Sequence, residues 1–271
     1  MSKRGLIRRI SDLGVTAPLR GGAVDLPAPI YSASFDGANE AMQTASAVDL
    51  SGTSTSCTAG CWVKWQAAAS VNADRIMDAW DTSNARCWLM SCGNSGYYGD
   101  FMVTITDDGI TTGKQYRAPE ADFTTNAWYL VGFTWVGGGA GDGTLKLWVN
   151  GSESTETINT DNSISEIFHS SSAEITFAGN HTLTDKFPAI RVHQPFIANS
   201  YAFTADDWSE AYNAGSSLNM RNHSQYSNLS HYWDFEQPGD AINTVLADVI
   251  GSNDIDTFNN MEVGDLVEDT P

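Results

Sequence analysis

Apolar and polar residues alternate along most of this chain in short runs that end in turn residues. In "GTLKLWVNGSES", residues 143–154, Leu145, Leu147 and Val149 fall on one face of an extended chain, and the residues between them fall on the other. The run stops at Asn150 and Gly151, a pair that favours the tight turn of a hairpin. This pattern predicts a half-buried strand that leads into a hairpin.

Similar runs recur with turn residues between them from residue 31 onward, and a further one begins at Ser230. The nine main runs cover residues 31–36, 58–66, 74–80, 86–92, 100–106, 126–136, 143–150, 173–178 and 187–197. Many short strands without intervening helices predict an antiparallel sandwich rather than a parallel α/β fold. We expect Trp62, Trp128, Phe133 and Trp135 to lie between its two sheets.

One segment has the pattern of a short accessory helix. In "TADDWSEAYNAG", residues 204–215, Thr204 is a suitable N-cap, Asp206 and Asp207 suit the positive end of the helix, and Gly215 is a suitable end. The glycine-rich run at 136–144 lacks the Gly-Lys-Ser/Thr ending of a phosphate loop and precedes a strand, so it indicates a hairpin loop.

Charge divides the chain into an arm and a body. The first 20 residues hold five basic residues and one acid, a net charge of +4. Since the whole chain of 271 residues has a net charge of −19, the other 251 residues have a net charge of −23. An acidic body of this kind repels nucleic acid and anionic membranes. No run approaches the roughly 20 apolar residues of a membrane span, so we expect no membrane partner.

The same patterns predict three parts. Residues 1–30 form a basic arm and an extended linker, residues 31–239 form the sandwich, and residues 240–271 form an acidic, irregular extension packed on it. Charged residues interrupt the apolar run that a secretory signal would need near residues 1–12, so we expect no signal peptide. The arm is the place where an acidic or polyanionic partner could bind.

The four cysteines border apolar runs and lack the knuckle turns of zinc sites. They are Cys57, Cys61, Cys87 and Cys92, in "CWVKW" and "CWLMSC" contexts. Buried free thiols are therefore expected rather than zinc ligands or disulfides.

Six stretches in order resemble the concanavalin A-like sandwich of the laminin G and pentraxin superfamily. They are "YSASFDGANEAM" at 31–42, "AGCWVKW" at 59–65, "FTTNAWYLVGFTW" at 123–135, "GTLKLWVNGS" at 143–152, "AEITFAGN" at 173–180 and "FIANSYAFTADDWSEAYNAG" at 196–215. The resemblance covers about 185 residues and implies an all-β, two-sheet antiparallel jelly roll with one short accessory helix.

The ending from His231 resembles the C-terminal extension of such sandwiches in tailed bacteriophages, with a Trp-containing strand, a D-x-x-G-S-N-D run and a terminal Asp-x-Pro. This resemblance implies a bacteriophage structural protein that displays its sandwich on the virion surface, as a capsid decoration or a fibre or tail component. Other virion proteins would be its partners, in a homo-oligomer, with Lys3, Arg4, Arg8 and Arg9 as anchors and host surface glycans as ligands. The alternative is a soluble carbohydrate-binding lectin or the receptor-binding tip of a tail fibre.

The sequence offers no catalytic pattern. Retaining glycoside hydrolases of the superfamily place acids in one strand as Glu-x-Asp-x-x-Glu or Glu-x-Asp-x-Glu, but the nearest match, "EADFTT" from Glu120, has Thr at the second Glu position. The five histidines lie apart, and no Gly-x-Ser-x-Gly is present. We therefore expect no enzyme.

Loop residues are the candidates for ligand and metal binding. Stacking and hydrogen bonding to sugars are expected from Asn94, Tyr97, Tyr98, Asp107, Asp108 and His181, although packing and turn formation are the more ordinary roles of these residue types. No cofactor is required. Calcium is the one that the resemblance allows, at Asp36 and Asn180, although "FPAIRV" at 187–192 stands where family members place an acidic residue.

Overall fold

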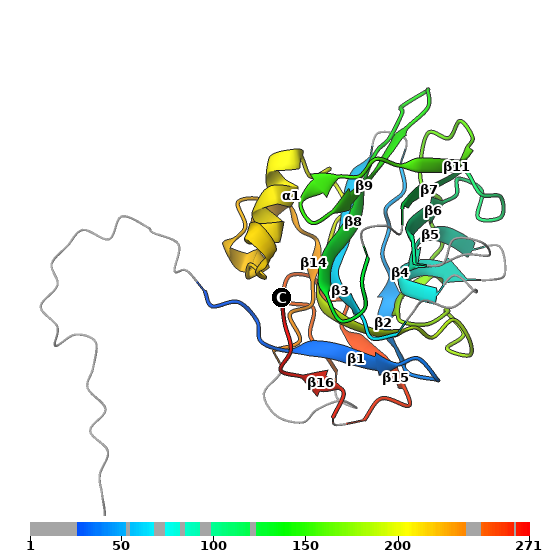
Figure 1. Ribbon diagram of the computed structural model, residues 1–271. Coiled ribbons are helices and arrows are strands. Elements are labelled where there is room, and N and C mark those ends of the chain that lie inside the picture. The colour runs from blue at the N-terminus through cyan, green and yellow to red at the C-terminus, as the bar shows by residue number, and fades with distance from the viewer. Residues whose placement is uncertain are drawn as a thin grey trace, which may run out of the picture.

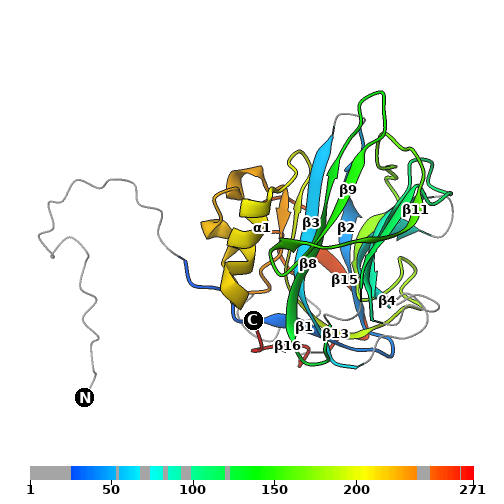
Figure 2. The ribbon, with the colours of Figure 1, turned by 45° about the horizontal axis from the view of Figure 1, so that its top comes forward.

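The computed structural model describes residues 26–52, 55–67, 74–81, 85–92, 99–119, 123–236, 245–262 and 264–271 (Figure 1). In these residues two antiparallel sheets face each other, and one short helix lies outside them (Figures 1 and 2). The predicted all-β, two-sheet jelly roll with a short accessory helix is confirmed. No helix in the described part of the chain is long and apolar enough to cross a membrane.

Sheet A has the hydrogen-bonded order β10-β9-β8-β3-β13-β1-β16, and β14 also pairs with β13. Its strands are β1 (Ser32–Asp36), β3 (Ser56–Trp65), β8 (Trp128–Val136), β9 (Thr144–Val149), β10 (Ser152–Glu153), β13 (Ala189–Ala198), β14 (His231–Tyr232) and β16 (Leu266–Val267).

Sheet B has the order β11-β7-β6-β5-β4-β12-β2-β15. Its strands are β2 (Ala41–Ala47), β4 (Asp74–Asp81), β5 (Ala85–Cys92), β6 (Phe101–Ile105), β7 (Lys114–Ala118), β11 (Thr157–Asp161), β12 (Glu174–Phe177) and β15 (Ile255–Asn259). The sequence pattern predicts four of them, β4, β5, β6 and β12, and misses the other four.

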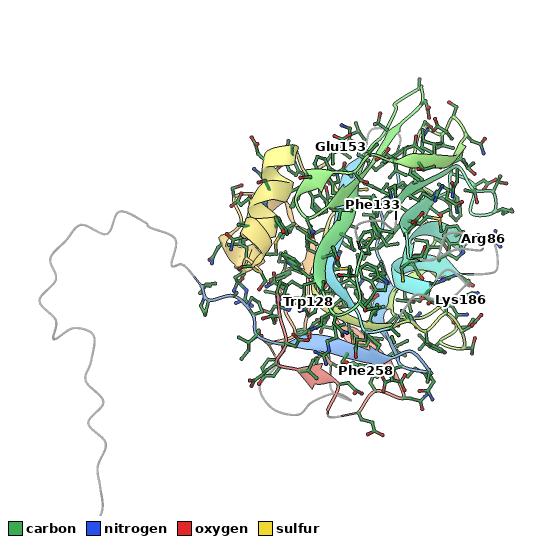
Figure 3. All side chains as sticks on the ribbon, in the orientation of Figure 1. Arg86, Trp128, Phe133, Glu153, Lys186 and Phe258 are labelled. Atoms are coloured by element: carbon green, nitrogen blue, oxygen red, sulfur yellow. The ribbon has the colours of Figure 1, made fainter. Side chains whose placement is uncertain are left out.

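The main core fills the space between the sheets. Leu145 and Leu147 point into it from β9, as their alternation predicts, and Phe133 and Trp135 are fully buried there (Figure 3). Phe133 packs on Trp88 of sheet B with ring centroids 5.6 Å apart. The predicted turn at Asn150 and Gly151 is also confirmed, because both residues have positive φ, 51° and 77°.

A second apolar cluster covers the outer face of sheet A, where α1 (Ala205–Tyr212) lies against β3, β8 and β9 (Figure 2). Thr204 and Asp207 form the reciprocal capping box that begins the helix. The helix ends at Asn213, which adopts a left-handed conformation, so Gly215 is not its end as predicted. Three 3-10 turns follow, at Asn213–Gly215, Met220–Asn222 and Tyr226–Asn228.

A pair of glycines makes room for the helix. Gly60 on β3 and Gly132 on β8 lie opposite each other in the ladder, and the indole of Trp208 lies over both. A Cβ atom at Gly132 would stand 2.2 Å from Trp208 Cη2, and one at Gly60 would stand 2.8 Å from the same atom. These two positions therefore require glycine for α1 to approach the sheet, and we call this place the Trp208 slot.

Two of the four predicted inter-sheet aromatics point the other way. Trp62 is buried, but it lies in the outer cluster and stacks on Tyr212 with ring centroids 5.6 Å apart. Trp128 is only half-buried and lies on the same outer face, beside Lys64 (Figure 3). Both predictions are wrong about the face because Trp62 and Trp128 occupy the outward positions of β3 and β8, where α1 and the C-terminal segment supply the cover.

The C-terminal segment belongs to both sheets. β15 pairs with β2 at the edge of sheet B, and β16 pairs with β1 at the edge of sheet A. The prediction of an irregular extension is therefore wrong for these two stretches. Their few apolar residues gave only a weak pattern, yet the open edges of β1 and β2 offer them backbone partners.

The end of the predicted linker is extended but docked on the body. Asn222 exchanges two hydrogen bonds with the backbone of Leu26, at 3.0 and 2.7 Å, and Asn219 Nδ2 donates to the carbonyl of Pro27 at 2.8 Å. Glu236 Oε1 accepts from the backbone nitrogens of Ile30 and Tyr31. The direction in which the chain enters the sandwich is thus fixed.

The four cysteines are buried free thiols, as predicted. Burial raises the pKa of each thiol. These groups are therefore neutral and unreactive at neutral pH.

Candidate functional site

Three of the six predicted ligand residues, Asn94, Tyr97 and Tyr98, lie outside the described residues, as do the predicted anchors Lys3, Arg4, Arg8 and Arg9. The connection that carries the first three joins Cys92 to Gly99, and the ladder pairs Cys92 with Asp74 and Phe101. Both of its flanks therefore lie at one end of sheet B.

Asp107 and Asp108 lie at the other end of sheet B, in the turn that follows β6, and both are exposed. Asp108 Oδ1 accepts hydrogen bonds from the backbone nitrogens of Ile110 and Thr111, at 2.8 and 2.6 Å. These backbone donors lower the pKa of Asp108. Asp108 thus shapes a turn.

His181 is brought together with two residues that the sequence pattern did not single out. Its Nδ1 lies 3.2 Å from Glu174 Oε2 and 3.1 Å from Gln43 Nε2, and Gln43 Nε2 also donates to the carbonyl of His181 at 3.1 Å. An imidazole, a carboxylate and an amide therefore converge at the outer face of sheet B. We call Gln43, Glu174 and His181 the polar triad.

The polar triad is accessible, because 21% of the His181 side chain and 26% of the Glu174 side chain remain exposed. Gln43 comes from β2 and Glu174 from β12, while His181 lies on the connection from β12 to β13. This connection passes beside β4, where Arg75 donates its backbone N–H to the carbonyl of Lys186. His181 is therefore held over the sheet and does not extend into solvent.

The strand register continues the triad into a polar strip across sheet B. Residues in register on its outer face are Thr257, Gln43, Thr176, Asp78, Leu89, Thr104 and Gln115. Gln43 Nε2 donates to Thr176 Oγ1 at 3.2 Å, and Gln115 Nε2 donates to Thr104 Oγ1 at 3.0 Å. Amide and hydroxyl groups therefore line this face.

A buried ion pair lies in the middle of the strip. Arg75 Nη1 is 2.9 Å from Asp78 Oδ2, and both side chains are more than nine-tenths buried. Burial raises the pKa of Asp78 to about 7, although Arg75 opposes the shift. Among the described residues, Asp78 Oδ1 and the hydroxyl of the nearby Ser91 have no hydrogen-bond partner. Buried polar atoms of this kind usually have a partner, in the protein or from solvent or a ligand.

The predicted calcium residues have other roles. Asp36 Oδ1 accepts from the backbone nitrogens of Ala38 and Asn39, and Asn180 Oδ1 accepts from those of Thr184 and Asp185. In the described part of the chain, no group of three or more His, Cys, Asp or Glu side chains could hold a metal ion. These two oxygens therefore serve as turn acceptors, and calcium binding stays a prediction.

Several carboxylates lie close together at the turn between β1 and β2. Burial and the neighbouring charges of Asp265, Asp36 and Glu262 raise the pKa of Glu40, against one backbone hydrogen bond from Asp36. Burial and the charges of Glu262 and Asp36 also raise the pKa of Asp265. Ionisation of Glu40 and Asp265 is therefore less favourable in the folded state than in the unfolded chain.

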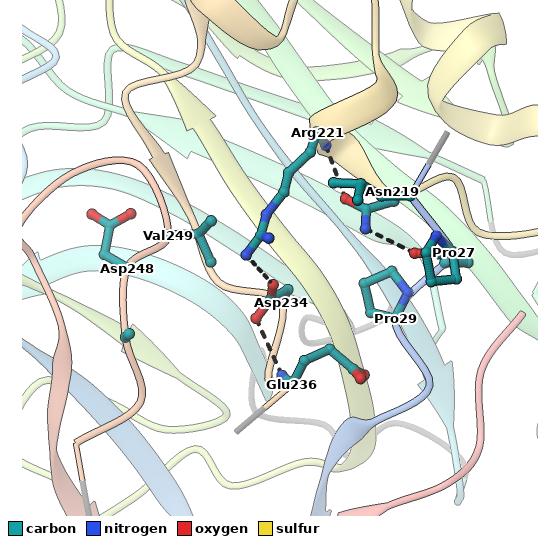
Figure 4. A pocket seen from close by; sticks show the side chains of 11 residues that line it. Pro27, Pro29, Asn219, Arg221, Asp234, Glu236, Asp248 and Val249 are labelled. Carbon is teal, nitrogen blue, oxygen red and sulfur yellow. Dashed lines mark hydrogen bonds and ion pairs between the residues drawn. The ribbon is translucent and has the colours of Figure 1, made fainter. Parts of the chain in front are cut away.

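A pocket of about 570 Å³ lies between the docked linker and the segment after α1 (Figure 4). Arg221 forms an ion pair with Asp234 at 2.9 Å, and Asp234 Oδ1 accepts the backbone N–H of Glu236 at 3.2 Å. Asn219 holds Pro27, as described above. The polar groups of this pocket therefore hold the linker against the body and are already engaged. For this reason we take the polar triad, and not this pocket, as the candidate ligand site.

Fold and site together define a concanavalin A-like jelly-roll domain with a polar outer face. Neither a protein-family model nor a curated protein sequence matches the chain. Among solved structures, a candidate carbohydrate-binding protein from Bacteroides ovatus ATCC 8483 is similar over 90% of this chain, with a TM-score of 0.61 and 14% identity. The chain spans 60% of the length of that protein.

The heptameric SAP-like pentraxin of Limulus polyphemus is similar over 70% of this chain and 85% of its own, with a TM-score of 0.51 and 15% identity. At such low identity both similarities establish the fold alone.

Proposed function

We propose that this protein is a non-enzymatic carbohydrate-binding domain that holds a glycan at the polar triad. The observation that carries the proposal is that His181 Nδ1 lies 3.2 Å from Glu174 Oε2 and 3.1 Å from Gln43 Nε2 on an accessible sheet face. A sugar presents hydroxyls that both donate and accept hydrogen bonds. Carboxylate, amide and imidazole groups held in place can bind such hydroxyls and fix the orientation of the ring.

Two further observations support the proposal. The Bacteroides ovatus protein with the same fold is described as a candidate carbohydrate-binding protein. In addition, the sequence between β5 and β6 contains Asn94, Tyr97 and Tyr98, residue types that bind sugars, although these residues lie outside the described part of the chain. An aromatic ring gives a sugar an apolar surface to stack on.

The test begins with a glycan array probed with the full-length chain, followed by calorimetric titration of the best ligand. Glu174→Gln and His181→Ala should each weaken binding about tenfold, since a hydrogen bond to a charged or well-placed group contributes about 1.5 kcal/mol. His169→Ala is the matched control. His169 lies 3.6 Å from Asp49 as another half-buried histidine beside a carboxylate, and its loss should leave binding unchanged.

The proposal fails if the folded protein binds no glycan at millimolar concentration. It also fails if both triad variants bind as well as the unaltered protein, because binding would then lie elsewhere on the sandwich.

Attachment to a virion remains a second proposal, supported by the resemblance of the C-terminal ending to bacteriophage proteins. In it, the +4 arm binds an acidic surface on other virion proteins, and the docked linker fixes where the arm leaves the body. Substituting Arg4, Arg8 and Arg9 together by alanine should then release the protein from particles without unfolding it, and added salt should have the same effect. Immunogold labelling of purified particles is the measurement, and unlabelled particles would contradict the proposal.

A further inference from the structure

The C-terminal residues 264–271 end on a cationic surface of sheet A that the helix does not cover. On the outer face of β3, Thr58, Gly60 and Trp62 lie towards the α1 cluster, and Lys64 is the next outward residue. Lys64 lies over the ring of Trp128, with its ammonium 5.7 Å from the ring centroid. Arg191 on β13 lies opposite Lys64 in the ladder. We call Lys64, Trp128 and Arg191 the cationic cradle.

One carboxylate occupies this cradle. Asp269 Oδ2 pairs with Lys64 Nζ at 2.7 Å and with Arg191 Nη1, and Asp269 Oδ1 accepts from Trp128 Nε1 at 3.4 Å. Three neighbouring strands therefore each direct one donor to a single side chain. Burial and the charge of Arg191 lower the pKa of Lys64, which is the expected effect of two cations held side by side.

The backbone of the segment is held as a short edge strand. Leu266 and Val267 pair with Ala33 and Ser32 of β1, and Ser32 Oγ donates to the carbonyl of Asp269 at 2.8 Å. Leu266 and Val267 are only half-buried, and Leu266 packs against the margin of the core, so the ladder and the ion pairs supply most of the contacts that hold this end. An edge strand attached in this way can leave without opening the inter-sheet core.

We propose that the cationic cradle and the edge of β1 form an interaction surface for residues 264–271 of a second copy of this chain, in exchange with its own. The segment that fits the surface is present in every copy, and each contact described above would be the same between copies as within one. Exchange of an identical element is a low-cost route to oligomers because it requires no new interface.

Charge explains why this exchange is selective. The chain carries −19 overall, so the bodies of two copies repel each other. The paired Lys64 and Arg191 on the sheet face, by contrast, attract an acidic segment. Because residues 264–271 are joined to their own body, their effective concentration at their own cationic cradle is about millimolar. Exchange between copies therefore occurs when the protein concentration reaches a comparable value.

The first experiment uses the unaltered protein. Chains grown in ordinary and in 15N medium are mixed and treated with a water-soluble carbodiimide, which joins a lysine amine to a carboxylate in contact with it. Mass spectrometry then reads the cross-link between the Lys64 and Asp269 peptides. We expect mixed-isotope cross-links whose share rises with protein concentration towards the millimolar range. Cross-links that are all of one isotope at every concentration would overturn the proposal.

A pair of charge-reversed variants distinguishes contacts between copies from contacts within one copy. The variant Asp269→Arg repels its own cradle, and the variant Lys64→Glu/Arg191→Glu repels its own segment, so each should be monomeric and less stable alone. Mixed, they restore opposite charges only between copies and should elute at twice the monomer mass, and 1 M salt should weaken this dimer as the Debye length falls to about 3 Å.

The chain that combines all three substitutions is the control, because it restores the pair within one copy. It should be monomeric and regain the thermal midpoint of the unaltered protein. Recovery in this control together with a monomeric mixture would overturn the exchange between copies. A control that does not recover would overturn the cradle itself as the holding contact.

Discussion

Replacing Trp208 by alanine should remove the strongest attachment of α1 to the sandwich. Trp208 is fully buried, stacks on Trp148 at 5.8 Å with an angle of 14° between the planes, and packs against Phe196 and Phe203. Truncating a buried tryptophan costs about 3–5 kcal/mol because it loses transfer free energy and leaves a cavity. We place Trp208→Ala towards the upper end, since the glycine slot beneath the indole has no side chain that could fill the space.

The measurement is urea unfolding followed by circular dichroism, with the midpoint and slope fitted together. A loss of about 4 kcal/mol is a large part of the 5–15 kcal/mol that holds a typical domain together. Trp128→Ala is the matched control. Trp128 is a half-buried tryptophan on the same sheet face, and its replacement should cost about 1–2 kcal/mol. If the two substitutions cost the same, or if Trp208→Ala costs less than about 1 kcal/mol, the Trp208 slot does not hold the helix.

Three further predictions concern the buried His193, the glycine at position 132 and the carboxyl group of Glu40. Burial lowers the pKa of His193 to about 4, so the unfolded chain takes up its proton first and stability falls as pH drops from about 6.5 to about 4. The loss should approach about 3 kcal/mol, should be smaller in His193→Gln, and is checked by urea midpoints at pH 7 and pH 4.5. Gly132→Ala should cost at least about 1–3 kcal/mol by the same assay, because its Cβ would meet Trp208 at 2.2 Å and a backbone oxygen at 2.5 Å, whereas Gly264→Ala meets nothing and should be neutral. The folded state raises the pKa of Glu40, so the ionised carboxylate destabilises the fold relative to the neutral form. Glu40→Gln should therefore raise the thermal midpoint at pH 7 and not at pH 4. An equal rise at both pH values would contradict the electrostatic explanation.

The alternation of residues was enough to predict most strands of sheet A and the strands β4, β5, β6 and β12 of sheet B. Each of these strands alternates large apolar residues with smaller or polar ones. The turn at Asn150 and Gly151 could also be predicted, because this pair of residue types readily adopts the positive φ angles that the turn requires. The alternation failed for β2, β7, β11 and β15, which have only one or two large apolar residues each, and the inward residues of β7 include the small Ala118. Such strands are specified by pairing with neighbours that are distant in sequence, and a local pattern does not contain that information.

The same limit applied to the faces of strands and to the site. Trp62 and Trp128 are as apolar as Trp135, and only the presence of α1 and residues 264–271 on the outer face distinguishes them. His181 was a candidate by residue type alone. Gln43 and Glu174 lie far apart in the sequence, because the residues that follow them, Thr44 and Ile175, are separated by 131 positions. Only the pairing of β2 with β12 brings the two side chains to His181.

The place of β15 and β16 at the edges of the two sheets has a consequence for synthesis. β1 must wait for β13, more than 150 residues later, before it has any strand partner, and the edges of β1 and β2 are completed only by residues 255–267. During translation at about 5–20 residues per second, the first strands therefore emerge long before their partners. Pairing at such sequence separation closes slowly, and the open strands can pair wrongly in the meantime. Pairing of β15 and β16 thus ends the period in which the edges of β1 and β2 lie open.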